Sequence, residues 1–200
     1  LFALAGTAHA VTITFQNPNA DTPTDSYNPS DDTCNNTQIS GSDLCDKGKG
    51  FNYKKGGELD VKVTADNTDG NASLMQDLAP KNSGLAVISP NDSSSDDQIQ
   101  VATGESVLFD FGSNVNLLGF DFNDGNDSEC DPAGSEGSCG FFDLYVDSTD
   151  VGNFEAKDDL MFTNPFAGTK FRVTHIGDDI DENGNGVGDE GGFAIGSVTA

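Results

Sequence analysis

Residues 106–122 read SVLFDFGSNVNLLGFDF and carry the clearest structural signal in the chain. Apolar side chains, many of them β-branched or aromatic, alternate with polar or small ones at a period close to two. This pattern is typical of strands that bury one face. Gly, Ser and Asn in the middle of the stretch favour a turn. We therefore expect two strands here, at 107–111 and 115–122.

Similar segments recur along the chain, whereas helix signals are nearly absent. Further strands are expected at 11–15, 59–63, 141–146, 171–176 and 193–198, with weaker candidates at 85–88, 99–101 and 160–162. The only segment that resembles a helical turn is 72–78. About ten short strands predict an all-β fold, an antiparallel two-sheet β-sandwich that is jelly-roll-like and contains almost no helix.

The strand signals predict one domain over residues 11–200. Within it, residues 17–57 are polar and carry two of the cysteines, so we expect them to form a long loop region with a disulfide.

The acidic charge of the chain excludes several classes of partner. The 34 acidic and 9 basic residues give a formal net charge of −25, which repels nucleic acid and anionic membranes. Asp accounts for 27 of the acids and Glu for 7, and Asp favours turns and caps over helix interiors. No run of about 18 apolar residues occurs. We expect the acids to lie in loops, with no nucleic-acid partner and no membrane insertion of these residues.

Residues 1–10 resemble the end of a secretory signal peptide. An apolar stretch is followed by Ala8-His9-Ala10, the small-x-small pattern that signal peptidase cleaves. We expect cleavage after Ala10 and export of the remainder. The alternative is an ordinary buried first strand.

The four cysteines form two pairs that are local in sequence, Cys34 with Cys45 and Cys130 with Cys139. Local pairing is the simplest of the three possible arrangements. Each bridge would close a loop of about ten residues and contribute about 2–3 kcal/mol. A zinc site is disfavoured because there is no CxxC spacing, and disulfides fit an oxidising compartment.

Four segments, in order, resemble the ectodomains of PEP-CTERM proteins: SGLAV at 83–87, DDQI at 96–99, GESVLFDF at 104–111 and VNLLGF at 115–120. The similarity continues in GFAIGSV at 192–198. The chain departs from the usual GLGV pattern at Ala86, and the Pro-Glu-Pro sorting motif is not among these residues. The resemblance implies an exosortase-sorted protein, secreted to the extracellular space or outer cell surface of a Gram-negative bacterium. It also implies an association with exopolysaccharide and no shared catalytic residues.

A calcium loop is predicted at 179–190, where the sequence matches D-x-[DN]-x-[DN]-G-x5-E in full. Ca²⁺ takes six to eight oxygen ligands, and this spacing wraps carboxylates around one point. Strands on both sides predict a loop that closes a β-hairpin rather than an EF-hand. The alternative is a solvated acidic connection. The expected metal ligands are Asp179, Asp181, Asn183, Asn185 and Glu190.

A second, weaker calcium site is predicted at Asp121, Asn123 and Asp127. Oxygen ligands alternate in this segment, but it has no bidentate Glu at the right distance.

The sequence offers no catalytic motif: GxSxG, HExxH and GxxxxGK[ST] are all absent. His175 lies in an alternating strand, where a structural role is expected. We therefore expect a non-enzymatic, secreted structural protein of the cell surface or extracellular matrix, stabilised by Ca²⁺.

Two alternatives remain open. The first is a calcium-dependent carbohydrate-binding or adhesion module, which the absence of Trp makes less favourable. The second is a filament subunit that adds segment 11–15 as a strand to its neighbour. Exopolysaccharide or like subunits are the corresponding partners.

Overall fold

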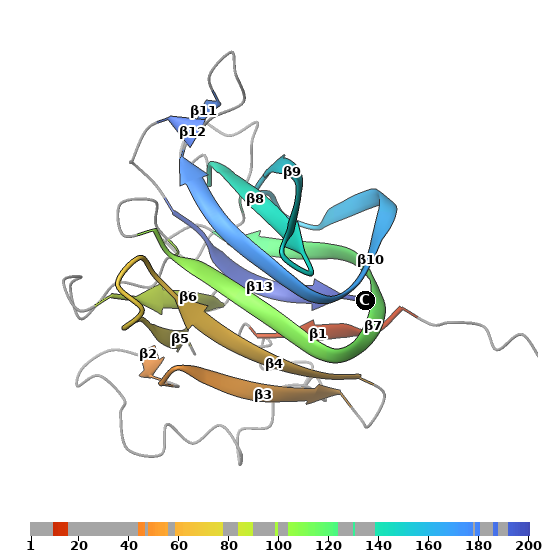
Figure 1. Cartoon of the computed structure of the whole chain (residues 1–200), viewed down its shortest axis with the longest axis horizontal. Coiled ribbons are helices and arrows are strands. Elements are labelled where there is room, and N and C mark those ends of the chain that lie inside the picture. The colour runs from red at the N-terminus through yellow and green to blue at the C-terminus, as the bar shows by residue number, and fades with distance from the viewer. Residues whose placement is uncertain are drawn as a thin grey trace, which may run out of the picture.

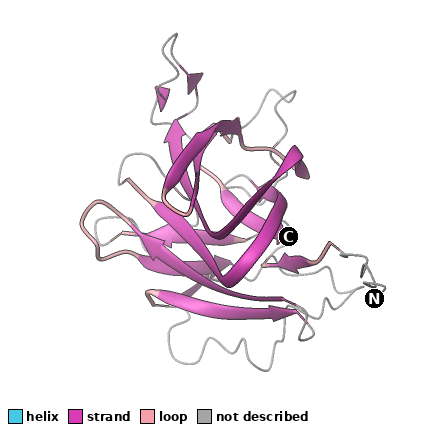
Figure 2. Ribbon diagram, turned by 45° about the vertical axis from the view of Figure 1, so that its right-hand side comes forward, coloured by secondary structure: helices cyan, strands magenta, loops and turns pink. Residues whose placement is uncertain are grey.

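The computed structural model describes residues 10–15, 44–46, 48–55, 59–77, 84–89, 99, 104–123, 130, 139–177, 179–180, 186–187 and 192–200. Every regular element within these ranges is a strand, as Figure 2 shows. Eleven strands form one sheet and two more form a separate ribbon. The predicted all-β, antiparallel fold is confirmed; its jelly-roll connectivity stays a prediction.

The large sheet contains β1 (Thr12–Thr14), β2 (Leu44–Asp46), β3 (Gly50–Lys55), β4 (Leu59–Asp66), β5 (Ser73–Asp77), β6 (Leu85–Ile88), β7 (Ser106–Asn123), β8 (Phe141–Val146), β9 (Thr149–Glu155), β10 (Leu160–Gly177) and β13 (Ala194–Thr199). The ribbon consists of β11 (Asp179–Ile180) and β12 (Gly186–Val187). The described residues contain no helix long and apolar enough to cross a membrane.

Two 18-residue strands, β7 and β10, pair with each other and form the centre of the fold. Their ladder is interrupted twice: residues 111–114 of β7 lie opposite only Thr169, and residues 162–165 of β10 lie opposite only Leu118. At the first interruption Gly112 has a φ of 67°, a conformation that glycine adopts without strain. Such insertions bend a sheet, so both strands curve (Figure 1). Two strands were expected in each region because the corners resemble turns in sequence.

The bends divide the sheet into two facing layers. In the front layer, residues 106–110 of β7 lie between β4 and the end of β10, with β3 beyond β4 and β8 and β9 beyond β10. In the back layer, residues 119–123 of β7 lie between β13 and the beginning of β10. Beyond β13 come β6, β5 and β2, while β1 pairs with the last residues of β13.

Phenylalanine side chains fill the space between the layers. Phe109 of the front layer contacts Phe120 of the back layer, with ring centroids 5.6 Å apart. Phe142 on β8 contacts Phe122 on β7 at 4.9 Å and Phe193 at 6.2 Å. All five rings are buried, and burial of each contributes about 1.5–3 kcal/mol. The apolar side chains that alternate in the sequence therefore form the interface between the layers.

Strand β1 is an edge strand that pairs with β13 of its own chain. The ladder continues to Val11 and Ala200, whose backbone groups exchange two hydrogen bonds. Phe15, just after β1, is fully buried, and its carbonyl accepts a hydrogen bond of 2.7 Å from the side-chain amide of Gln76. The carbonyl oxygen of that amide accepts a hydrogen bond of 3.0 Å from the Tyr53 hydroxyl. Side-chain hydrogen bonds thus join β1 to β3 and β5.

The structure corrects two expectations about secondary structure. The segment expected as a helical turn, 72–78, contains strand β5, which lies between β2 and β6 and buries Leu74 and Met75. Tertiary burial therefore outweighs the local preference. The range 17–57, expected as loop, contains β2 and also β3, which pairs along its full length with β4.

Two smaller differences concern the short strands. Strand β9 was not anticipated, because its sequence has little apolar alternation. A two-residue turn at Asp147 and Ser148, with φ of 46° and 73°, holds β9 against β8 in the geometry that tight hairpins require. The weak candidate at 99–101 is represented by an isolated bridge between Ile99 and Phe193.

Gly104 and Glu105, part of the GESVLFDF segment, have a structural role. Glu105 is fully buried, and its carboxylate accepts a 2.7 Å hydrogen bond from the Ser89 hydroxyl. That hydroxyl in turn accepts a 2.8 Å bond from the Asn67 amide. Gly104 has a φ of 64°, which suits glycine. Since a buried carboxyl group is costly unless it is hydrogen-bonded, this network fixes the beginning of β7 against the residues that follow β4 and β6.

We predict that Glu105→Ala destabilises the fold by about 2–4 kcal/mol, because it removes the acceptor of the buried Ser89 hydroxyl, to which the Asn67 amide in turn donates. This loss corresponds to a fall in Tm of about 5–12 °C for a chain of this size. The matched control is Glu155→Ala on the exposed edge of β9, which should change stability by less than about 0.5 kcal/mol. Equal melting temperatures for the two variants, measured by circular dichroism, would contradict the structural role of Glu105.

Candidate metal centre

A disulfide between Cys130 and Cys139 joins the segment after β7 to the segment before β8. The Cα atoms are 5.6 Å apart and both cysteines are buried. This is the local pairing that the spacing predicts. Cys34 lies outside the described residues, and only the backbone of Cys45 is described, so the other local pair stays a prediction.

The backbone beside this disulfide positions an acidic turn. The carbonyl of Cys130 accepts a 3.0 Å hydrogen bond from the amide of Asp158, and the carbonyl of Gly140 accepts a 2.9 Å bond from the amide of Ala156. These bonds hold the turn between β9 and β10 against the disulfide. Asp159 in this turn has a φ of 48°, which Asp tolerates better than most residues.

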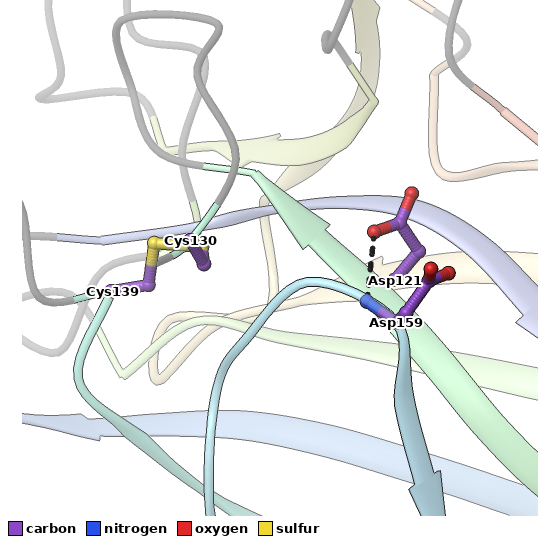
Figure 3. Close-up of a disulfide and its surroundings, with 4 residues drawn as sticks. All are labelled: Asp121, Cys130, Cys139 and Asp159. Carbon is purple, nitrogen blue, oxygen red and sulfur yellow. Dashed lines mark hydrogen bonds between the residues drawn. A yellow bond between two sulfur atoms is a disulfide. The ribbon is translucent and has the colours of Figure 1, made fainter. Parts of the chain in front are cut away.

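Asp121 lies on β7 in the back layer and faces this turn. It is opposite Ser197 of β13 and only 9% exposed. Its carboxylate accepts a long hydrogen bond of 3.4 Å from the amide of Asp159, and Figure 3 shows the two carboxyl groups close together. One ligand oxygen from each of Asp121, Asp158 and Asp159 lies within 4.8 Å of the others. We call these three residues the acidic triad.

The electrostatics of the triad depend on the burial of Asp121. Burial, and then a hydrogen bond with the Asp158 carboxyl group, raise the pKa of Asp121 to about 7. This value also includes the negative charges of both neighbours, which raise the pKa, and the hydrogen bond from the Asp159 amide, which lowers it. At neutral pH the triad therefore favours either a shared proton or a bound cation.

The chemistry of the triad suits a hard cation. Three carboxylates can supply a large part of the six to eight oxygens that Ca²⁺ binds at about 2.3–2.6 Å, and waters can supply the remainder. A catalytic acid would also have a raised pKa. The three carboxylates gathered at one point could also hold a cation between them.

The triad overlaps only in part with the second calcium site expected from the sequence. Asp121 belongs to both. Asn123 is two positions further along β7 and almost fully buried, and Asp127 lies outside the described residues. Sequence reasoning missed Asp158 and Asp159, because they are about 37 residues away and only the approach of the β9–β10 turn to β7 brings them together. The one available signal was an Asp-Asp pair directly before a predicted strand.

The structure describes only part of the predicted calcium loop at 179–190. Asp179 pairs with Val187 and Ile180 with Gly186, so the backbone forms a small hairpin with residues 181–185 at its tip. The side chain of Asp179, and Asp181, Asn183, Asn185 and Glu190, lie outside what the structure describes.

The flanking strands do not form the hairpin that was expected around the 179–190 loop. β7 lies between β10 and β13 in the sheet, so the strands on either side of the loop are not neighbours. Sequence alternation predicts each strand but not which strand lies between them.

His175 is a buried base in the core. It is 2% exposed, its ring packs edge-on against Phe193 at 5.2 Å, and neither ring nitrogen has a hydrogen-bond partner in the described part of the chain. A Cβ on residue 140 would lie 2.6 Å from its Nε2, so the space beside the ring requires Gly140. Burial lowers the pKa of His175 to about 4.

The low pKa of His175 predicts a loss of stability in acid. The unfolded chain binds this proton near pH 6.5 and the folded chain only near pH 4, so stability falls as the pH falls through that window. The loss reaches about 3 kcal/mol at pH 4. Urea unfolding at pH 7 and pH 4.5 should show a smaller acid-induced loss for His175→Leu than for the parent chain, by about 2–3 kcal/mol. Carboxyl groups titrate in both proteins, so only the difference is informative; equal losses would contradict a neutral His175.

No protein-family model, curated protein or solved structure shows a significant match to this chain.

Proposed function

We propose that this chain is a secreted, non-enzymatic structural protein of the cell surface or extracellular matrix, stabilised by calcium. The buried disulfide supports an oxidising compartment. The PEP-CTERM-like segments support export from a Gram-negative bacterium. Two of those segments, GESVLFDF and VNLLGF, lie within or beside the central strand β7, where they supply core side chains and the buried Glu105. This structural use of the segments supports a scaffold.

The acidic triad carries the calcium part of the proposal. At an effective dielectric constant of about 20, two unit charges 4.8 Å apart repel by about 3 kcal/mol, and the triad contains three such pairs. Asp158 and Asp159 are partly exposed, so solvent reduces this repulsion, but burial of Asp121 still makes ionisation of all three carboxyl groups unfavourable. A bound Ca²⁺ turns this repulsion into attraction. The 179–190 loop stays a second proposed calcium site on the basis of its sequence.

The placement of β1 favours this scaffold over a filament assembled by strand addition. Ile13 and Phe15 are fully buried in their own chain. Release of β1 to a neighbouring subunit would expose both side chains, at a cost of about 3–6 kcal/mol, unless an identical strand replaced it.

We predict that millimolar Ca²⁺ raises the Tm of the full chain by about 5–10 °C relative to EDTA, as binding at 100 times the Kd stabilises by about 2.7 kcal/mol. Asp121→Asn should raise the Tm in EDTA, because it removes one of the repelling charges, and it should reduce the Ca²⁺ response. The matched control Asp69→Asn, in an exposed turn, should retain the full response.

A third variant, Asp181→Asn, separates the two proposed calcium sites. A Ca²⁺ response that Asp121→Asn leaves intact and Asp181→Asn abolishes would place the ion in the 179–190 loop and show the triad assignment to be wrong. An unchanged melting temperature of the parent chain in Ca²⁺ and EDTA would overturn calcium stabilisation at both sites.

A further inference from the structure

The single arginine of the chain lies in a row of side chains that crosses the outer face of the front layer. Strand register places Thr64, Leu108, Arg172, Tyr145 and Asp150 side by side on β4, β7, β10, β8 and β9. Residues in register across neighbouring strands project from the same face of a sheet. The inward neighbours of Arg172, Phe171 and Val173, are buried in the core, so the row faces outward.

Arg172 is held in place but retains its hydrogen-bonding capacity. Its guanidinium carbon lies 4.3 Å from the centre of the Tyr145 ring, a stacked cation–π contact. Among the described residues, the ion pair that the structure shows is between Lys170 and Asp110, at 3.0 Å, and no carboxylate lies within 4 Å of Arg172. A guanidinium stacked on a ring keeps its N–H groups in the plane, directed at its surroundings. Within the part of the chain that the structure describes, Arg172 is therefore a preorganised donor for which no acceptor is seen.

A hollow of about 330 Å³ opens around this arginine. Its lining combines the apolar surface of Leu108 and Tyr145 with the donors Arg172 and Lys170 and the acceptors Asp66 and Ser148. The volume lies at the lower end of the range for small-ligand sites. A few convergent polar groups on an apolar surface are what a small polar ligand requires.

A second hollow, of about 430 Å³, lies beside the first on the same face. It is lined by Asn52, Lys62, Asp110 and Phe111, among others. Asp110 in this hollow forms the ion pair with Lys170 in the first, so the two hollows share one boundary. Adjacent polar hollows suit a ligand built from repeated polar units.

The charges around the hollows decide between a neutral and an anionic ligand. Lys170 is paired with Asp110, and the first hollow is lined by one further cation, Arg172, and one further carboxylate, Asp66. Asp143 and Asp150 also lie close enough to Tyr145 to act on its charge state. A ligand carboxylate or phosphate would meet these acids and the net charge of −25, whereas neutral hydroxyl groups can use donors and acceptors alike.

We propose that the outer face of the front layer binds a neutral oligosaccharide, with Arg172 and Asp66 as the principal hydrogen-bonding groups and Tyr145 as the residue that orients Arg172. Sugar hydroxyls accept from the guanidinium and donate to the Asp66 carboxylate, while the apolar side of a ring covers Leu108. The site is built without the acidic triad or the 179–190 loop, so it goes beyond the calcium-stabilised scaffold and does not depend on it.

Isothermal titration of the full chain with neutral hexasaccharides of cello-, malto- and manno- type tests this site, with oligogalacturonate as the anionic counterpart. We expect at least one neutral probe to bind and oligogalacturonate to bind more weakly. Arg172→Gln should weaken binding about tenfold or more, because it removes charged hydrogen bonds, and Tyr145→Phe, which keeps the ring under Arg172, should weaken it much less. Thermal melts of both variants establish that they are folded.

Several results would overturn the proposal: no binding of any neutral probe, tighter binding of oligogalacturonate, or equal affinities for the parent chain and a folded Arg172→Gln variant. The titration is repeated in EDTA. Binding that persists in EDTA supports the site, and binding that disappears while the chain stays folded would assign the sugar to a calcium centre instead. Since calcium stabilisation is measured by melting and sugar binding by titration, either proposal can be wrong without the other.

Discussion

The ladder between β7 and β10 is the interaction on which the two-layer structure depends. Both strands take part in both layers. Every other strand of the large sheet is linked to β7 or β10 by hydrogen bonds, either directly or through the strands between them. Paired residues of β7 and β10 are about 50 positions apart in sequence. The chain must therefore close large loops before the ladder can contribute to stability. The two corners then set the distance across which Phe109 meets Phe120 and Phe122 meets Phe142. The bends in the ladder and the packing of the phenylalanine rings therefore depend on each other, because neither arrangement is favourable without the other.

Among the described residues, the sheet buries two carboxyl groups and one imidazole, Glu105, Asp121 and His175, and each has a different environment. Glu105 accepts a hydrogen bond from a hydroxyl that itself accepts one, so its carboxyl group is satisfied within a fixed network. His175 gives up its proton and remains as a neutral aromatic ring beside Phe193. Asp121 lies against two further carboxyl groups, Asp158 and Asp159, whose charges oppose its ionisation. The three environments show that burial alone does not mark a functional group. Of these residues, only Asp121 has neighbours that oppose its ionisation, and a proton or a cation would relieve that repulsion.

The sequence predicts the strands that show local alternation of apolar and polar residues. It does not predict the features that depend on contacts between distant segments. The phenylalanine-rich strands were predictable, because their period of two survives in the structure as an alternation of buried and exposed residues. Strand β5 was not, since Leu74 and Met75 are adjacent, face opposite sides of the sheet and are both buried, so the segment lacks the alternation that burial of one face produces. The candidate site divides in the same way. An alternating acidic segment indicated Asp121, but Asp158 joins it through a backbone hydrogen bond to Cys130, which no spacing encodes.

The formal charge of −25 acts differently on the two proposed sites. At the acidic triad, excess negative charge favours a divalent cation, and salt weakens that attraction at separations beyond a Debye length of about 8 Å. On the outer face of the front layer Asp110 is matched locally: Lys170 and Lys62 lower its pKa, with the hydrogen bond from Lys170 as the largest cause. Hydrogen bonds to neutral hydroxyls carry no net charge into this face, so they are insensitive to the distant acids. One strongly acidic protein can therefore hold a cation in its turns and a neutral ligand on its sheet, with only the first depending on ionic strength.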